Sequence, residues 1–163
     1  MKKTKPPGGP PQAYKIRELR AADLGSGFLE TLGNLSEIGG LTPAAARKIL
    51  RTMGRSPLYR VFVAVGADGQ VVGATTLLVE QKFIHGGGLV GHIEDVAVRK
   101  GYEGRGVGGS LVRAAVETAE GLGCYKCILE CREELVGFYE KLGFRRHSVG
   151  MRIDLKRDSR REA

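Results

Sequence analysis

Apolar residues recur along most of the chain in two periods, which predict its strands and its helices. Runs with the alternation or β-rich composition of strands cover residues 14–19, 61–65, 71–79, 89–98, 125–131 and 144–155. Runs with helical spacing cover residues 21–35, 43–53, 109–121 and 133–142. Thr42 and Pro43 supply an N-cap and a first-turn proline for the second helix. The predicted order is β-α-α-β-β-β-α-β-α-β.

Glycine-rich turns separate the middle strands of this order. Ala67-Asp68-Gly69-Gln70 lies between two predicted strands and is typical of a tight β-hairpin. Three consecutive glycines at residues 86–88 break the chain before the next strand. No repeat or linker is visible, so residues 13–156 are expected to form a single domain. The Lys/Pro/Gly-rich residues 1–12 are expected to be a disordered basic tail, and residues 157–163 a charged tail.

The most distinctive stretch joins the strand at residues 89–98 to the helix that follows it. Five glycines fall within nine residues there: Gly101, Gly104, Gly106, Gly108 and Gly109. Without side chains, several backbone N–H groups can converge on one ligand, and the positive end of the helix dipole adds to them. This pattern predicts a site for a phosphorylated cofactor.

The spacing of the glycines limits which cofactor it is. A nucleotide-binding P-loop is excluded, since no Lys-Ser or Lys-Thr follows the glycines. A dinucleotide fingerprint fits the letters but belongs at the start of a βαβ unit, whereas this stretch follows three predicted strands. The segment from Glu103 to Gly108 resembles [QR]-x-x-G-x-[GA], the acyl-CoA pyrophosphate loop of the GNAT superfamily. Glu103 departs from it, so either Arg105 supplies the cation or Glu103 points to solvent.

Further blocks resemble one family within that superfamily, the glucosamine-6-phosphate N-acetyltransferases. They are Thr31-Leu32-x-x-Leu35-Ser36, Leu41-Thr42-Pro43, Lys82-Phe83-Ile84-His85, residues 91–98 (GHIEDVAV), Gly123-Cys124-Tyr125-Lys126 and residues 138–144 (FYEKLGF). These blocks stay in register over residues 16–153, which is nearly the whole chain. The resemblance implies an α/β (α+β) chain with the GNAT fold, a mixed and mostly antiparallel sheet splayed in the middle and flanked by helices.

The resemblance also implies a cofactor and an assembly. Acetyl-CoA would be bound by Val96, Ala97, Val98, Glu103, Gly104, Arg105, Gly106, Val107, Gly108, Gly109 and Tyr139. Backbone N–H groups of Val96 and Val98 would meet the thioester carbonyl and the pantetheine. Leu135 replaces an Asn that often bonds pantetheine in the family. A homodimer is implied, in which the C-terminal strand crosses to the neighbour and completes the acceptor site.

Acetyl transfer to an amine needs a neutral amine, a polarised carbonyl and a stabilised leaving thiolate. By the resemblance, Tyr139 lies near the sulfur and is the candidate general acid, with ordinary helix packing as the alternative. Glu94 and Asp95 meet the amino sugar, although a solvated strand edge would also explain them. As neighbours on a strand they are expected to face opposite sides. Glu130, where the family has Asp, would lie near the reactive amine.

The resemblance implies a set of residues around the sugar and its phosphate. The candidates are Ser36, Lys82, His85, Glu94, Asp95, Tyr125, Lys126, Glu130 and Arg152. The family's phosphate-binding Arg on the last strand aligns with Asp154, which would repel a phosphate. Arg152 lies two residues away on the same predicted strand face and can take its place.

Composition and charge fit one ordinary globular domain of 163 residues, with 42% hydrophobic and 27% charged side chains. The net charge of +8 divides into +5 over residues 1–20, +2 over residues 152–163 and +1 over the rest of the chain. Because most of the positive charge lies at the two ends and not over the domain, nucleic acid is disfavoured as a partner. No apolar run reaches the roughly 18 residues of a membrane span, and no signal peptide is visible, so a cytoplasmic location without membrane attachment is expected.

The three cysteines, Cys124, Cys127 and Cys131, lack a fourth ligand at zinc spacing. We therefore expect three reduced, packed thiols and no metal. Three hypotheses remain for the activity of the chain. It is a glucosamine-6-phosphate N-acetyltransferase, or an acetyltransferase of the same scaffold for another small amine or a protein N-terminus or lysine, or a non-catalytic acyl-CoA-binding module.

Overall fold

The computed structural model describes residues 14–155, so both predicted tails lie outside the described residues. These residues form two compact units, which divide between Leu129 and Glu130. The first unit holds every strand of the described chain, and the second holds two short helical segments.

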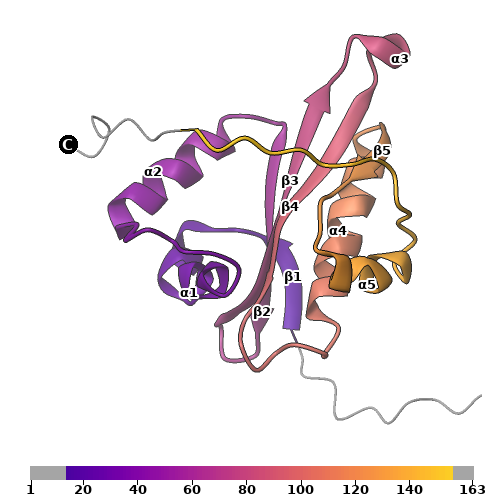
Figure 1. Cartoon of the computed structure of the whole chain (residues 1–163). Coiled ribbons are helices and arrows are strands. Elements are labelled where there is room, and N and C mark those ends of the chain that lie inside the picture. Colours follow the sequence, from indigo (N-terminus) through magenta and orange to yellow (C-terminus); the bar gives the residue numbers. More distant parts are fainter. Residues whose placement is uncertain (1–13, 156–163) are drawn as a thin grey trace, which may run out of the picture. The chain divides into compact units, whose positions relative to one another are not determined.

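The first unit is built on a five-stranded sheet in the order β1-β2-β3-β4-β5. Its strands are β1 (Tyr14–Glu18), β2 (Tyr59–Gly66), β3 (Val71–Gln81), β4 (Leu89–Val98) and β5 (Cys124–Ile128). Strands β1 to β4 pair with one another in antiparallel fashion, and β5 is parallel to β4. The predicted mixed, mostly antiparallel sheet is confirmed (Figure 1).

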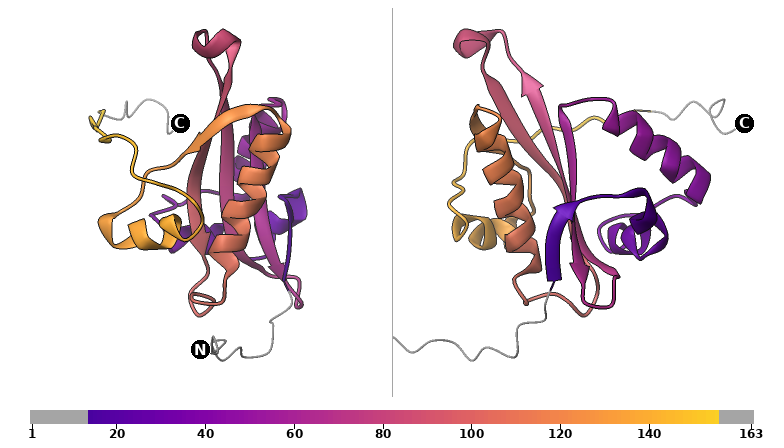
Figure 2. Two further views of the ribbon diagram at one scale, coloured as in Figure 1. Left: turned by 90° about the vertical axis from the view of Figure 1, so that its right-hand side faces the viewer. Right: turned by 180° about the vertical axis from the view of Figure 1, so that it is seen from behind.

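Helices cover both faces of this sheet (Figures 1 and 2). On one face lies α4 (Val107–Gly121), and on the other lie α1 (Phe28–Gly33) and α2 (Pro43–Gly54). Close approach of α4 depends on Gly73 of β3, where an added Cβ would lie only 2.6 Å from Val107 Cγ1. Apolar side chains fill both interfaces, among them Leu77, Ile93, Leu111 and Val112, and on the other side Phe28, Val63, Val71 and Ala74.

Two local signals in the sequence are confirmed by hydrogen bonds. The Thr42 hydroxyl accepts the Ala45 N–H at 3.2 Å and caps α2. In the turn between β2 and β3, the Asp68 carboxylate accepts the Gln70 N–H at 3.0 Å, and Gly69 has a φ of 78°. A further short turn, α3 (Ile84–Gly87), closes the long β3–β4 hairpin at the predicted three-glycine break.

The sheet opens between β4 and β5. Their pairing runs from Leu89 and Cys124 to His92 and Ile128, whereas β4 continues to Val98. A β-bulge lies in this second half of β4, where Asp95 has a φ of 52° and the Thr75 hydroxyl donates to the Glu94 carbonyl at 3.0 Å. Beyond His92, β4 therefore has one sheet edge without a strand partner among residues 14–155.

The helix predicted over residues 21–35 is wrong in its middle. The structure has a 3₁₀ helix, η1 (Ala21–Gly25), and then α1, separated at Gly27, whose φ is 91°. The Asp23 carboxylate accepts the Arg20 N–H at 2.7 Å and two hydrogen bonds from Arg17, each 2.7 Å long, so it caps the start of η1 and joins it to β1. The helical path is interrupted at Gly27, because a right-handed helix does not contain its left-handed backbone conformation.

The second unit contains η2 (Glu133–Leu135) and α5 (Val136–Glu140). The predicted last strand is wrong for the isolated chain, since residues 144–155 contain no strand. Its alternating apolar residues are exposed: Val149 by 88%, Met151 by 95%, Ile153 by 82% and Leu155 by 81%. A strand requires a partner for its backbone, and the alternation alone does not supply one.

Cys124 and Cys127 are partly buried on β5, and burial raises the pKa of the Cys127 thiol to about 11. Cys131 is exposed, so the prediction that all three thiols are packed is wrong at this position. Within residues 14–155, no group of three or more His, Cys, Asp or Glu side chains is placed to hold a metal ion. None of the helices described there is long and apolar enough to cross a membrane.

Candidate active site

The glycine loop leads into the N-terminus of α4, the longest helix described. Gly106 is its N-cap, with a φ of 81° and no side chain to cap the first turn. The N–H groups of Val107, Gly108 and Gly109 belong to that first turn and have no acceptor within the helix. Such a helix end attracts an anion, because its exposed N–H groups and its dipole act together.

Three glycines of this loop have the left-handed backbone that other residues avoid. The φ angles are 87° at Gly101, 71° at Gly104 and 81° at Gly106. An added Cβ at Gly101 or Gly104 would meet nothing within 4 Å. The loop therefore needs glycine for its backbone path, and its outer side is open.

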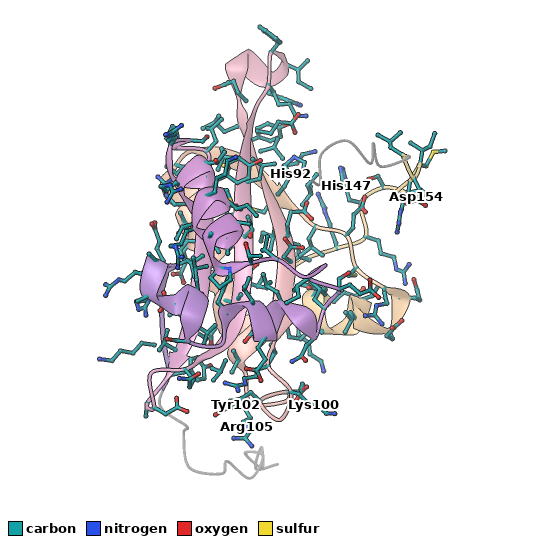
Figure 3. All side chains as sticks on the ribbon, turned by 90° about the vertical axis from the view of Figure 1, so that its left-hand side faces the viewer. His92, Lys100, Tyr102, Arg105, His147 and Asp154 are labelled. Carbon is teal, nitrogen blue, oxygen red and sulfur yellow. The ribbon has the colours of Figure 1, made fainter. Side chains whose placement is uncertain are left out.

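The charged side chains of the loop are arranged around this path. Glu103 accepts the Gly101 N–H at 2.6 Å, so the residue that departs from the acyl-CoA motif closes the loop on itself. The Arg105 guanidinium lies 5.2 Å from the centre of the Tyr102 ring. Figure 3 shows Lys100, Tyr102 and Arg105 together on this loop, far along β4 from His92. Arg105 is thus an exposed cation next to Gly106, the N-cap of α4.

The predicted contacts on β4 lie in the half beyond His92. Ala97 is buried, while Val96 and Val98 are partly exposed. The Asn34 side chain donates to the Val98 carbonyl at 3.3 Å and ties α1 to this end of the strand. Glu94 and Asp95 are both exposed, and the bulge between them and Ala97 interrupts the simple alternation on which the expectation of opposite faces was based.

A polar group that the sequence did not reveal lies on the β3–β4 hairpin. Glu80 of β3 accepts a hydrogen bond from Lys82 Nζ at 2.6 Å, and its other carboxylate oxygen lies 2.8 Å from His92 Nε2. The hydrogen bond from Lys82 has the largest effect, and together with that from His92 it holds the pKa of Glu80 below its usual range. Only the register, which pairs Leu78 with His92 and Glu80 with Val90, could have identified Glu80 and His92 as neighbours.

Three predicted acceptor-binding residues come together between the hairpin tip and β5. The rings of His85 and Tyr125 are 4.6 Å apart between centroids, and Lys126 Nζ lies 5.7 Å from the Tyr125 ring centre. Ser36 follows α1 and is exposed.

Tyr139 is buried inside the second unit, where it is 7% exposed. Its ring lies edge-on to Phe138 and Phe144, at centroid distances of 4.9 and 5.9 Å. Burial, together with the nearby Cys131, raises the pKa of the Tyr139 phenol above its usual value. The phenol therefore keeps its proton at neutral pH, as a general acid must.

Two further acidic residues of the second unit have defined partners. Glu130 is exposed, and its carboxylate lies against the backbone of Gly150. Arg152 donates to Asp154 Oδ1 from Nε at 2.8 Å and from Nη2 at 2.5 Å. The guanidinium predicted to replace the family's phosphate ligand is thus paired with the acid at the aligned position.

Known proteins resemble this chain in both sequence and fold. The family model described as "Acetyltransferase (GNAT) family" matches residues 36–144, which is more than half of the chain. The chain belongs to the GNAT acetyltransferase family.

Two relatives and one solved structure make the family resemblance specific. Glucosamine 6-phosphate N-acetyltransferase 1 of Oryza sativa subsp. japonica is 46% identical, over 88% of this chain and 88% of the relative. The glucosamine 6-phosphate N-acetyltransferase of Trypanosoma brucei brucei is 40% identical, over 86% of this chain and 95% of the relative. The crystal structure of the Arabidopsis thaliana enzyme of that name superposes with a TM-score of 0.85 at 30% identity, over 88% of this chain and 99% of the other. The resemblance seen in the sequence is confirmed.

The GNAT family uses acetyl-CoA, and the residues present here fit that molecule. Its pyrophosphate needs several N–H donors and a nearby cation, which the start of α4 and Arg105 would supply. The open side of Gly101 and Gly104 leaves space for the phosphates. The roles of the individual residues stay predictions.

Proposed function

We propose that this chain transfers the acetyl group of acetyl-CoA to the 2-amino group of glucosamine 6-phosphate, by direct transfer between the two bound substrates. The similarity to enzymes named for this reaction, over nearly nine tenths of the chain, carries the proposal. The first unit supports it, because it contains both the N-terminus of α4, whose N–H groups suit an anion, and a group of His85, Tyr125 and Lys126 near the hairpin tip.

The glycine loop and β4 hold acetyl-CoA, which supplies the acetyl group as a thioester. Residues 103–109 bind the pyrophosphate through backbone N–H groups, with Arg105 as the cation. The edge of β4 that β5 leaves free includes Val96, Ala97 and Val98. The N–H groups of Val96 and Val98 meet the thioester carbonyl and the pantetheine, and the one at the carbonyl polarises it, since charge develops on that oxygen in the transition state.

Acidic residues prepare the acceptor amine. Glu130 orients the amine and takes its proton, directly or through a water molecule. Glu94 and Asp95 contact the sugar from the bulge of β4, and the left-handed backbone at Asp95 sets the direction in which they project. Tyr139 donates its proton to the departing sulfur, which its raised pKa allows at neutral pH.

Cations and rings around the hairpin bind the sugar phosphate. Lys82, His85 and Lys126 supply positive charge or N–H donors, and Tyr125 supplies a ring between the last two. Ser36 adds a hydroxyl. Arg152 contributes only after phosphate competes with Asp154 for its guanidinium.

A homodimer belongs to the same proposal. The exposed, alternating apolar residues at positions 149, 151, 153 and 155 have the pattern of a strand that pairs with a second copy of the chain. Sedimentation at micromolar concentration is expected to give a dimer, and a monomer would contradict this assembly. The cytoplasmic location stays a prediction from the sequence.

A free-thiol release assay tests the activity. The protein is given acetyl-CoA with glucosamine 6-phosphate, glucosamine, polyamines and peptides in turn. Turnover highest with glucosamine 6-phosphate supports the proposal. Faster turnover with another amine favours a different acetyltransferase of this scaffold, and acetyl-CoA binding without thiol release from any amine favours a non-catalytic module.

A further inference from the structure

A contact between two hydroxyl groups joins the edge strand β1 to the start of α4. The phenol oxygen of Tyr14, the first residue of β1, lies 2.9 Å from the Ser110 hydroxyl, and either group can donate. Arg113 also donates to this hydroxyl, at 3.3 Å, which a serine oxygen with two lone pairs can accept. Because α4 packs mainly against β3 and β4 and meets β1 only slightly, the bond is a separate tie between the helix and the edge strand.

This contact lies at the first turn of α4. The Ser110 N–H donates at 3.0 Å to the carbonyl of Gly106, the N-cap. A Cβ added to Gly106 would lie 3.8 Å from the Tyr14 phenol oxygen. The phenol oxygen is therefore close to both ends of the turn that contains the N–H groups of residues 107–109.

The first turn of α4 is weakly held by its own sequence. Gly106 has no side chain to cap it, and Gly108 and Gly109 follow inside the helix. Glycine loses more backbone freedom than any other residue when it is fixed in a helix, and helix ends fray. A hydrogen bond from Ser110 to a strand restrains this turn from outside the helix.

We propose that Tyr14 and Ser110 are positioning residues for acetyl-CoA, and that their hydrogen bond holds the first turn of α4 in the conformation that binds the pyrophosphate. The inference rests on the proposed function, in which residues 103–109 bind that group. Binding to a turn that is already ordered costs less conformational entropy than binding to one that must first be ordered. Loss of the bond is therefore expected to weaken the binding of the pyrophosphate and to spare the contacts with pantetheine.

Calorimetry on the full-length protein tests the pair. Tyr14→Phe and Ser110→Ala are each expected to raise the Kd of acetyl-CoA about 3- to 10-fold, the usual effect of one neutral hydrogen bond. The double variant is expected to stay within about 2-fold of the weaker-binding single variant, since both changes remove the same bond. Acetylpantetheine has no pyrophosphate, and its Kd, measured by competition with acetyl-CoA, is expected to change by less than about 2-fold in each variant.

Two matched controls remove a hydroxyl group elsewhere. Tyr59→Phe removes a phenol oxygen at the exposed start of β2. Thr118→Val removes a hydroxyl near the other end of α4, where it donates to the Ala114 carbonyl at 2.8 Å. Both variants are expected to keep the Kd of acetyl-CoA.

Several results would overturn the inference. An unchanged Kd of acetyl-CoA in Tyr14→Phe and Ser110→Ala is one, and losses that add in the double variant are another. An equal loss for acetylpantetheine, together with a lowered thermal midpoint, would show that the bond supports the fold in general. Absence of acetyl-CoA binding by the intact protein would overturn this role and the proposed function together. If the intact protein binds acetyl-CoA but acetylates a different amine, only the proposed acceptor is wrong, and the calorimetry still decides the role of Tyr14.

Discussion

The ammonium group of Lys82 lies 2.6 Å from the Glu80 carboxylate. Lys82 follows β3 directly, at the base of the hairpin tip, and Glu80 also contacts His92 on β4. The carboxylate thereby fixes the position of a cation that is expected to meet a phosphate. An ammonium group has three donors, so Lys82 can keep Glu80 and still donate to a phosphate oxygen.

This arrangement predicts that Lys82 separates phosphorylated from unphosphorylated acceptors. A charge-assisted contact to phosphate is worth about 1.5–3 kcal/mol, so Lys82→Ala is expected to raise the KM for glucosamine 6-phosphate about 10- to 100-fold. The KM for glucosamine is expected to stay within about 2-fold, since that sugar lacks the phosphate. Initial rates with both sugars measure the difference.

The control for this prediction is Lys48→Ala, on the exposed side of α2. It removes an equal charge outside the predicted site and is expected to change neither KM. Equal turnover of both sugars by the intact protein would show that phosphate is not recognised, and an acetyltransferase for another amine would then be the better hypothesis.

The glycine loop leads to a prediction about the affinity for acetyl-CoA. Gly106→Val places a branched side chain at the N-cap of α4, where the phosphate is expected to contact the helix N–H groups. The loss of one such contact is expected to raise the Kd of acetyl-CoA about 10- to 100-fold by calorimetry. An unchanged Kd would be incompatible with a pyrophosphate site at this loop.

Backbone strain is the alternative explanation for weaker binding, and Gly69→Val controls for it. Gly69 has a φ of 78°, close to the 81° of Gly106, and it also has space for a Cβ. It lies in the hairpin turn before β3, outside the predicted site. Its substitution is expected to cost about 1–2 kcal/mol of stability and to leave acetyl-CoA binding intact.

Local patterns in the sequence predicted most of the sheet and the start of α2. The strand at residues 89–98, the Asp68-Gly69 turn and the Thr42 cap depend on nearby residues alone, and the structure confirms each of them. The helix predicted over residues 21–35 failed because the chain takes a left-handed backbone conformation at Gly27, which the spacing of apolar residues does not reveal. The last strand failed because alternating apolar residues show that a segment can form a strand, but they do not show which strand it would pair with.

The candidate site likewise has features that the sequence predicted and features that it did not. The glycine loop was visible because glycine spacing is a local property of the chain. The bulge at Asp95, the pairing of Glu80 with His92 and the contact of Glu130 with Gly150 were not visible, because each depends on register or on residues brought together by folding. Of these three features, only the bulge affects an argument that was made from the sequence, namely that the side chains of Glu94 and Asp95 face opposite sides of the sheet.

The pairing of Arg17 with Asp23 predicts how stability depends on pH. The two hydrogen bonds from Arg17 hold the pKa of the buried Asp23 carboxyl below its usual range. Since the folded-state pKa lies below the unfolded value of about 3.9, the pair stabilises the protein above about pH 4, and this contribution is lost as the pH falls further. Asp23→Asn is expected to lower the free energy of unfolding by about 2 kcal/mol at pH 7.

Denaturant unfolding at several pH values measures this dependence. The difference between the intact protein and Asp23→Asn is expected to stay constant from about pH 7 to 5 and to shrink below about pH 4. Glu117→Gln, at an exposed position of α4, is the control and is expected to change stability by less than about 0.5 kcal/mol. A difference that grows toward low pH would have the wrong sign for this pair.

Tyr139 gives the most direct test of the proposed chemistry. Because burial raises the pKa of its phenol, the proton is available at neutral pH and is lost only in the alkaline range. If this proton goes to the departing thiolate, Tyr139→Phe is expected to lower kcat about 10²-fold and to leave the Kd of acetyl-CoA nearly unchanged. The phenyl ring keeps the packing against Phe138 and Phe144, so the fold is preserved. Tyr59→Phe, at the exposed start of β2, is the matched control and is expected to keep full turnover. Full turnover by Tyr139→Phe as well would mean that Tyr139 serves packing alone, and the thiolate would then leave without a proton from this side chain.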